Sequence, residues 1–332
     1  MINSSDINQP YSKQNKNPPE DYQNNHNRQH KRHNNGSIEY SSQLSTFNHN
    51  NTRQPPSSFE SQHRIETQPF SKNIVAKHYN AIPVVTKRSR EVSVIFGLKR
   101  FNNWIKSVLI ASYTKIGYKV LDLGCGKGGD LTKWSKHQIS EYVGLDIAAN
   151  SYPVNNVIAQ KDFKAHIVSA QFSIHYAFDS EIRVRQLLSN VANHLYSGGH
   201  FIGTTLNAYW LAKKKESTKS CKFGNSVYSI EFNENNGSSP FGLEYTYNLI
   251  GAIQGCPEYL VHLPTFKKIA KEYGLNLILN MPFHEYYKQN INNQKYNTLF
   301  HVMNVVDAKN TRISDDEWEA IGMYMVFVFQ KD

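Results

Sequence analysis

The sequence has little cysteine and no long apolar run. Its three cysteines, Cys125, Cys221 and Cys256, are odd in number and far apart, with neither the pairing of a disulfide framework nor the spacing of a metal site. No apolar run reaches membrane-spanning length, and polar residues rather than a signal-peptide pattern follow Met1. These absences argue against a disulfide-stapled secreted protein, a cysteine-ligated zinc module and a membrane-spanning helix. We expect an intracellular chain without a metal.

The first seventy residues also have few branched apolar side chains and are rich in Asn, Gln, Ser and His. Such a segment cannot bury enough apolar surface to offset the entropy lost on ordering it. We therefore expect residues 1–70 to be a disordered low-complexity tail and residues 71–332 to be the folded domain. The short run RQHKRH in the tail is a weak signal for import into the nucleus.

The excess of positive charge lies in the expected domain. The chain carries a net charge of +10, and residues 71–332 hold 30 basic against 21 acidic side chains. A basic folded domain favours an anionic partner such as RNA or DNA, although a modest excess also serves solubility.

From residue 71 onward, apolar strands alternate with amphipathic helices. The expected strands are 119–124, 141–147, 166–174, 200–206 and 322–331, and the expected helices are 102–115, 130–137 and one within 181–199 that ends at its glycines. Strands joined by helix-length crossovers predict an α/β fold with a doubly wound, mostly parallel sheet. We expect the strand 322–331 to pair antiparallel at the far side of that sheet.

A glycine-rich turn follows the first expected strand. Gly124, Gly126 and Gly129 match the pattern G-x-G-x-x-G, and Asp146 ends the next strand, where an acid that binds ribose belongs. This pattern alone is compatible with NAD, FAD or S-adenosylmethionine. A Walker phosphate loop is excluded because a glycine, rather than Ser or Thr, follows Lys127.

Two neighbouring features favour methyl transfer. Asp122 places a carboxylate at the strand end, which suits a positively charged cofactor better than a pyrophosphate. The stretch HLYSGGHFIG (194–203) has the helix, glycine and strand order often seen in methyltransferases that use S-adenosylmethionine. NAD chemistry remains an alternative at this point.

Seven stretches together resemble the eukaryotic mRNA cap guanine-N7 methyltransferases and extend over residues 71–332. They are HYN (78–80), FNNWIKSVLI (101–110), VLDLGCGKGGDLTKW (120–134), GLDIAANS (144–151), QFSIHYAF (171–178), CPEYLV (256–261) and GMYMVFVF (322–329). The resemblance implies a class I S-adenosylmethionine-dependent methyltransferase fold. It also implies methylation of N7 of the guanosine cap of nascent mRNA, in the nucleus and beside the RNA polymerase II transcription and capping machinery.

This reaction makes modest chemical demands. N7 of guanine is already a nucleophile and the sulfonium methyl is already an electrophile, so alignment and exclusion of water suffice without a general base. Positive charge moves onto the purine, which a carboxylate and aromatic faces stabilise. The triphosphate bridge requires basic groups.

By resemblance, five residues hold S-adenosylmethionine. Lys106 would pair with the methionine carboxylate, and Gly124 would let the backbone approach the methionine portion. Asp146 would bind the ribose hydroxyls, while Gln171 and Tyr176 would line the wall nearest the methyl group.

The resemblance assigns seven residues to the cap, with positioning by His175, Tyr176, Glu258 and Tyr324 and no acid or base catalyst. Glu258 would accept hydrogen bonds from N1–H and the amino group of guanine. Asn102 and Asn103 would contact the capped nucleotide, Lys127 and Lys133 phosphates or cap edges, and His175 and Tyr324 would border the guanine. Taken singly, His175 on an apolar strand would more often be a buried core histidine. Glu258 could simply begin a strand, and Tyr324 could be one more core aromatic.

Three residues depart from the family pattern. Ile158 stands where the family tends to have an arginine near the cap, and Leu206 replaces a proline usual at that turn. Pro153 lies in the early part of the expected second crossover helix, where a first turn tolerates it.

The largest departure is a short spacing. Nineteen residues, 147–165, separate Asp146 from the strand that begins at His166. Two crossovers and a strand need roughly 25–29 residues, so one crossover fits and two hardly do. The family has an acid after its third strand that contacts adenine, and Asp162 is not a convincing substitute.

The short spacing predicts that this chain binds S-adenosylmethionine weakly. Three explanations of the short spacing are open: a gene model that discarded coding sequence, a shortened isoform or a degenerate copy. The alternative function is therefore a catalytically impaired protein that binds capped RNA.

Overall fold

The computed structural model describes residues 93–146, 163–235, 237–305 and 313–332. These residues lie in one compact unit, Ile65–Asp332. The tail expected over 1–70, its boundary at 71 and the stretch HYN lie outside the described residues. Pro153, Ile158 and Asp162 lie outside them as well.

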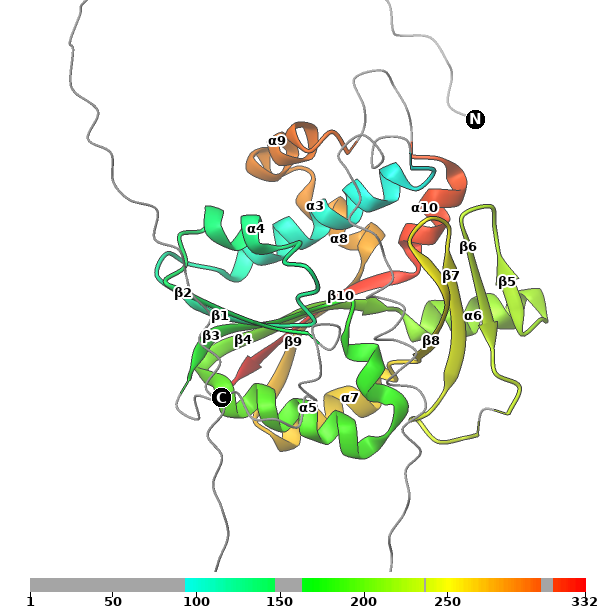
Figure 1. Ribbon diagram of the computed structural model, residues 1–332, viewed down its shortest axis with the longest axis horizontal. Helices are drawn as coiled ribbons and strands as arrows, with labels where there is room; N and C mark the ends of the chain where they lie inside the picture. Colours follow the sequence, from blue (N-terminus) through cyan, green and yellow to red (C-terminus); the bar gives the residue numbers. More distant parts are fainter. Residues whose placement is uncertain (1–92, 147–162, 236, 306–312) are drawn as a thin grey trace, which may run out of the picture. The chain divides into compact units, whose positions relative to one another are not determined.

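The core of the fold is a six-stranded sheet in the order β2-β1-β3-β4-β10-β9 (Figure 1). Its strands are β1 (Lys119–Leu123), β2 (Glu141–Leu145), β3 (Ala165–Gln171), β4 (Leu195–Leu206), β9 (Leu275–Pro282) and β10 (Tyr324–Lys331). Strands β2, β1, β3 and β4 are mutually parallel, whereas β10 is antiparallel to both β4 and β9. The expected α/β class with a mostly parallel sheet is confirmed.

Helices cover both faces of this sheet (Figure 1). One face carries α3 (Phe96–Tyr113), α4 (Leu131–Lys136), α8 (Phe283–Asn290), α9 (Gln294–Val302) and α10 (Asp315–Gly322), and the other carries α5 (Glu181–His194) and α7 (Leu263–Glu272). Successive side chains of β10 alternate between two hydrophobic clusters, as Val326 and Phe327 do. The sheet is therefore doubly wound.

Helix α3 forms because its apolar residues recur at helical spacing. Phe101, Trp104, Ile105, Val108 and Leu109 are all fully buried and form one stripe against the core. Asn102, Asn103 and Lys106 are among the half-buried residues of α3, and the last two contact Lys133 and Asp130 beside the glycine turn. The expected helix 102–115 is confirmed, but it begins earlier, at Phe96, and ends at Tyr113.

A second sheet was not expected from the sequence. Strands β5 (Lys222–Gly224), β6 (Tyr228–Phe232), β7 (Glu244–Leu249) and β8 (Ile253–Tyr259) form an antiparallel sheet, preceded by α6 (Ala208–Thr218). Strand β7 alternates half-buried and buried residues, and its buried tyrosines join the larger hydrophobic cluster. This sheet supplies residues to the site described below.

Several element boundaries differ from the expectation, and two of them have a clear cause in the backbone. The strand expected to reach residue 174 ends at Gln171, because Phe172 adopts a left-handed backbone with φ of 56° and a 3-10 helix, η1 (Ile174–Asp179), follows. Helix α5 ends at His194, because Leu195 is extended and already belongs to β4. Strand β10 is antiparallel as expected, but β9 rather than β10 forms the far edge.

At the other edge of the sheet lies β2. Among the described residues, no strand pairs with the side of β2 that faces away from β1. Residues 147–162, which connect β2 toward β3, lie outside the described part of the chain. The described sheet therefore holds one strand fewer beside β2 than the expected two-crossover arrangement.

Candidate active site

The glycine turn after β1 requires glycine at its first position. Gly124 has φ of +76°, and a Cβ atom built there would lie 2.5 Å from Cβ of Ser173. Its amide donates a hydrogen bond of 2.7 Å to the carbonyl of Leu145, the last residue of β2. The Ser173 hydroxyl donates to the carbonyl of Leu123 at 2.9 Å. The turn therefore joins β1, β2 and the segment after β3 at one point.

Asp146 closes the same turn from the end of β2. Its Oδ2 atom accepts a hydrogen bond of 2.7 Å from the amide of Gly126, which has φ of +52°. The carboxyl ends of parallel strands meet at one edge of a sheet, so the acid after the second strand lies beside the glycines after the first. The structure thus brings together Gly124 and Asp146.

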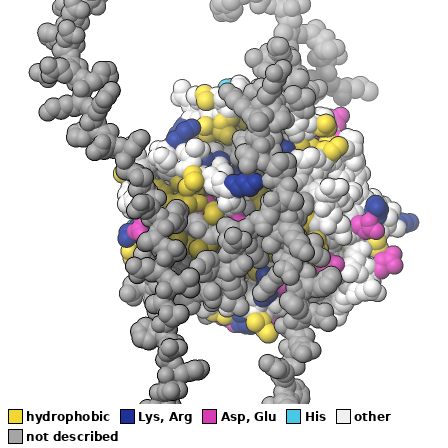
Figure 2. All heavy atoms as spheres, viewed as in Figure 1, with side chains coloured by type: hydrophobic (Ala, Val, Ile, Leu, Met, Phe, Trp, Pro, Cys, Tyr) yellow, Lys and Arg dark blue, Asp and Glu magenta, His cyan; other side chains and the backbone are white. Residues whose placement is uncertain are grey.

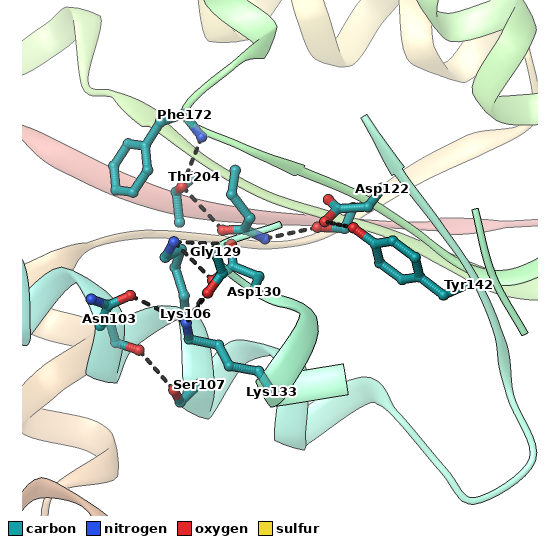
Figure 3. A network of polar contacts seen from close by, with 12 residues as sticks. Asn103, Lys106, Ser107, Asp122, Gly129, Asp130, Lys133, Tyr142, Phe172 and Thr204 are labelled. Atoms are coloured by element: carbon teal, nitrogen blue, oxygen red, sulfur yellow. Dashed lines mark hydrogen bonds and ion pairs between the residues drawn. The ribbon is translucent and has the colours of Figure 1, made fainter. Parts of the chain in front are cut away.

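A buried ion-pair network joins α3 to the start of α4 (Figure 3). The carboxylate of Asp130 lies 2.9 Å from Nζ of Lys106 and 2.6 Å from Nζ of Lys133, with all three side chains no more than 15% exposed. The Lys133 ammonium also donates to Oδ1 of Asn103 at 3.2 Å. Burial acts to raise the pKa of Asp130, but the two ammonium groups outweigh it and hold that pKa below its usual range. Two cations face one anion, so the network has an excess positive charge.

A second buried carboxyl lies at the end of β1. Asp122 is 2% exposed, and the hydroxyl of Tyr142 on β2 donates to its Oδ2 at 2.9 Å (Figure 3). Burial raises the pKa of Asp122 to about 6 despite that hydrogen bond. Burial likewise raises the pKa of the neighbouring Cys125 thiol to about 11, which keeps it protonated and excludes a thiolate nucleophile there.

Gln171 is fixed at the end of β3. Its Oε1 accepts from the Thr204 hydroxyl at 3.1 Å, and its Nε2 donates to Ser169 Oγ at 3.2 Å. The same Thr204 hydroxyl accepts from the amide of Phe172 at 3.1 Å (Figure 3). The backbone reversal at Phe172 is thereby tied to β4.

Three buried polar side chains form a cluster between η1 and the smaller sheet. Nε2 of His175 lies 3.5 Å from Oε1 of Glu258 on β8, and the Tyr245 hydroxyl on β7 donates to Oε2 at 2.9 Å. Burial lowers the pKa of His175 to about 3 and raises that of Glu258 to about 8. The contact is therefore between neutral groups at pH 7, although its distance is that of an ion pair. Among residues 93–146, 163–235, 237–305 and 313–332, neither ring nitrogen of His175 has a hydrogen-bond partner.

Aromatic side chains connect this cluster to the glycine turn. The ring centroid of Phe172 lies 5.9 Å from Nζ of Lys106 and 5.2 Å from the ring of Tyr324, the first residue of β10. The Tyr324 hydroxyl lies 2.6 Å from that of Tyr247 on β7. The structure thus places the lysine network, Phe172 and Tyr324 in succession across the carboxyl edge of the sheet.

The remaining predicted residues lie around these contacts. Tyr176 on η1 stacks at a tilt on His175, with ring centroids 4.1 Å apart, and its hydroxyl lies 3.6 Å from Sγ of Cys256. Asn102 is half-buried on α3, and its Oδ1 has no hydrogen-bond partner among the residues that the structure describes. Lys127 is exposed in the glycine turn. Leu206 is buried and lies opposite Tyr324 in the β4–β10 ladder.

Sequence reasoning missed Asp130, Tyr142, Tyr245 and Tyr247. Asp130 occupies the position before a helix, where an acid is ordinarily a capping residue, yet it makes no cap hydrogen bond and serves the two lysines instead. Tyr245 and Tyr247 were indistinguishable from packing aromatics. Only their alternation in EYTYNL, which places both on one face of a strand, pointed to a shared role.

Charged side chains are dispersed on the visible described part of one face of the molecule (Figure 2). On the described part of the face drawn in Figure 2, Lys and Arg side chains are scattered, several beside Asp or Glu, rather than gathered in one patch. Exposed pairs such as Lys222 with Glu231 account for part of this mixing. The described residues include neither a helix that could span a membrane nor a group of side chains that could hold a metal ion.

A family model matches most of the chain. The mRNA (guanine-N(7))-methyltransferase domain matches residues 62–156 and 151–332. The two matched segments meet at 151–156, inside the stretch that connects β2 to β3 and lies outside the described residues.

Curated proteins named mRNA cap guanine-N(7) methyltransferase are similar over a comparable range. One from Cryptococcus neoformans is 38% identical and aligns with 80% of this chain but 43% of its own length; a second from that species aligns with 49% of its length. The protein from Schizosaccharomyces pombe is 37% identical, with 81% of this chain and 84% of the relative covered. The chain thus spans about half the length of the Cryptococcus relatives.

Among solved structures, the CcbJ methyltransferase from Streptomyces caelestis matches 77% of this chain and 96% of its own, with a TM-score of 0.44 and 13% identity. A similarity of this size carries no conclusion about chemistry.

Proposed function

This chain belongs to the mRNA (guanine-N(7))-methyltransferase family, and on that premise we propose that it transfers the methyl group of S-adenosylmethionine to N7 of the guanosine cap of mRNA. One observation carries the proposal. The buried carboxyl group of Glu258 lies beside His175, whose ring nitrogens have no hydrogen-bond partner within the described part of the chain. The rings of Tyr324 and Phe172 lead from there to Lys106, which pairs with Asp130 just after the glycine turn. A purine-reading site and a cofactor turn are therefore adjacent.

The residues of the turn fit S-adenosylmethionine. The left-handed backbone at Gly124 keeps the turn free of a side chain, and Asp146 lies beside it with a carboxylate that suits ribose hydroxyls. The ammonium of Lys106, in a network where two cations share the one carboxylate of Asp130, suits the methionine carboxylate. The sulfonium supplies an activated methyl group, and these residues hold it in place while Gln171 and Tyr176 form the adjacent wall.

Glu258 is the group that we assign to guanine. Its two oxygens match the N1–H and amino donors of the Watson–Crick edge, and as a carboxylate it stabilises the positive charge that the ring acquires on methylation. His175 and Tyr324 border the ring. Because N7 needs no deprotonation, these residues act by orientation and charge stabilisation rather than by proton transfer.

The remaining cap contacts come from α3 and the glycine turn. We assign Asn102 and Asn103 to the capped nucleotide, and Lys127 and Lys133 to phosphates or cap edges. Lys127 is exposed, whereas Lys133 reaches the site from within the ion-pair network. An ammonium in each place provides charge for the triphosphate without a broad basic surface.

The proposed substrate, capped mRNA, supports a location for the protein in the cell. Capped mRNA arises at transcription, so we propose that the chain acts in the nucleus beside the RNA polymerase II capping machinery. The basic excess of residues 71–332 and the run RQHKRH are consistent with this location.

The test is a transfer assay. The full chain is incubated with S-adenosylmethionine labelled in its methyl group and with RNA ending in GpppN, then digested with nuclease and resolved. Label in 7-methylguanosine-containing caps is expected, and RNA ending in ApppN, which lacks the guanine edge, stays unlabelled. Label on an internal base or on protein would contradict the proposal.

A further inference from the structure

Strand β7 carries two buried tyrosines whose hydroxyl groups each reach a residue that we assign to the cap. The Tyr245 hydroxyl contacts Glu258, and the Tyr247 hydroxyl contacts Tyr324. We propose that Tyr245 and Tyr247 are positioning residues for guanine recognition, with Tyr245 orienting the Glu258 carboxyl group and Tyr247 orienting Tyr324. This inference rests on the proposed function and extends it to the smaller sheet.

The register of the sheet determines the first contact. Tyr245 and Glu258 are directly opposite each other in the antiparallel β7–β8 ladder, and both are no more than 1% exposed. Opposite side chains on one face of such a pair lie within contact distance. The 2.9 Å hydrogen bond from the Tyr245 hydroxyl to Oε2 therefore follows from strand pairing and holds one carboxylate oxygen at a defined place.

The second contact crosses from one sheet to the other. Tyr247 lies two residues beyond Tyr245, so its side chain projects from the same face of β7. Its hydroxyl meets that of Tyr324 at 2.6 Å, at the first residue of β10 in the central sheet. A single strand thus fixes the two cap residues that come from different sheets relative to each other.

Tyr245 also affects the charge of Glu258. Burial raises the pKa of Glu258, and the Tyr245 hydrogen bond opposes that rise. In the described part of the chain, the other titratable groups that face this carboxyl are His175 from η1, Tyr247 from β7 and Cys256 from β8 itself, and Tyr324 from β10 faces Tyr245. None of these is a cation at neutral pH. The tyrosine is thus the hydrogen-bond donor that favours the carboxylate, the form that accepts both donors of guanine.

The inference predicts that guanine binding releases a proton below about pH 8, because Glu258 ionises when it accepts those donors. The experiment is isothermal titration of the full chain with GpppG and with ApppA between pH 6.5 and 9, in two buffers of different ionisation enthalpy. It compares wild type with Tyr245→Phe and Tyr247→Phe. Titration with S-adenosylmethionine is run in parallel.

For Tyr245→Phe we expect about tenfold weaker GpppG binding, since a hydrogen bond to a charged group is lost. The midpoint of the pH dependence should move upward, because the lost bond favoured the ionised carboxyl. Tyr247→Phe should weaken GpppG binding without moving that midpoint. In both variants, the affinities for ApppA and S-adenosylmethionine should stay at the wild-type values.

Tyr228→Phe is the matched control. Tyr228 is a buried tyrosine of the same small sheet, and its hydroxyl donates to Glu319, a carboxylate with no assigned role at the cap, at 2.7 Å. Its removal should leave GpppG affinity and the pH midpoint unchanged. If Tyr245→Phe behaves like this control, or weakens S-adenosylmethionine binding equally, the inference is wrong. Those outcomes would overturn the inference alone. A wild-type chain that binds no GpppG would instead overturn the proposed function, and the inference with it.

Discussion

The ammonium of Lys106 lies 2.9 Å from the carboxylate of Asp130, which joins the middle of α3 to the residue that begins α4 (Figure 3). The pair is buried and shared with a second ammonium from Lys133. Removal of one lysine therefore leaves Asp130 paired, so the charge at the turn can be changed without an unpaired buried carboxylate.

For Lys106→Met we expect at least tenfold weaker binding of S-adenosylmethionine, because the methionine carboxylate loses its cation. Calorimetric titration with S-adenosylmethionine measures this loss. Lys119→Met is the control, since Lys119 also pairs with a carboxylate, Glu141, at 2.9 Å, but is exposed at the opposite end of β1. Equal affinities in the two variants would remove Lys106 from the cofactor site.

Gly124→Ala should destabilise the fold more than Gly117→Ala. Both glycines have a left-handed φ, but a Cβ at Gly117 would meet nothing within 4 Å, whereas one at Gly124 would collide with Ser173. We expect a loss of about 1–2 kcal/mol for Gly117→Ala and about 3 kcal/mol or more for Gly124→Ala, measured by urea unfolding.

Adding Ser173→Gly to Gly124→Ala tests the collision itself. The double variant should recover the part of the loss that comes from the contact and keep the part that comes from the backbone strain. If the double variant is no more stable than Gly124→Ala alone, the close approach to Ser173 is not the reason for glycine at this position.

The unfolding free energy of the wild type should fall as pH rises from 6 to 8 relative to that of Glu258→Gln. The pKa of Glu258 is about 8 in the folded chain and about 4.5 when unfolded, so the folded state holds a proton that the unfolded state has lost. The stabilising effect is complete below the unfolded pKa and disappears through the folded one. Asp122, with a pKa of about 6, contributes mainly below this window.

Over that interval we expect the wild type to lose about 2 kcal/mol more than Glu258→Gln, by urea unfolding at each pH. Subtracting the unfolding free energy of Glu258→Gln from that of the wild type at each pH removes the contribution of the titratable groups that both proteins contain. Parallel curves for the two proteins would show that Glu258 is ionised in the folded chain.

Insertion of the segment that the short connection lacks should tighten S-adenosylmethionine binding. We expect the chain with the corresponding residues of the Schizosaccharomyces pombe relative inserted before Ala165 to bind at least tenfold more tightly, because the family resemblance implies that this segment carries an acid that would contact adenine. An insertion of equal length in the exposed loop between β6 and β7 is the control. Sequencing of the transcript across codons 160–170 shows whether the segment was lost from the gene model, and equal affinities would refute the spacing argument.

The glycine turn was predictable because its constraints are local. A left-handed backbone at Gly124 and an acid at the next strand end leave a pattern in the sequence itself. The smaller sheet left no such pattern in the sequence, because which residues of short antiparallel strands pair is decided only when the chain folds. EYTYNL displayed its alternation, but that Tyr245 faces Glu258 is a property of the β7–β8 ladder. In the same way, the sequence predicted a helix start at Asp130, but not the lysine from α3 that its carboxylate binds.

The position of β10 has a consequence for how the protein is made. During synthesis β10 emerges after both of its neighbours, yet it lies between them, so β9 has no place in the central sheet until β10 has been translated. A nascent chain that stops before Tyr324 exposes the hydrogen-bonding edge of β4, an aggregation hazard, and lacks one of the residues assigned to the cap. The proposed methyl-transfer activity should therefore arise in a single late step of biosynthesis, and prematurely terminated chains should be substrates for chaperones and proteases.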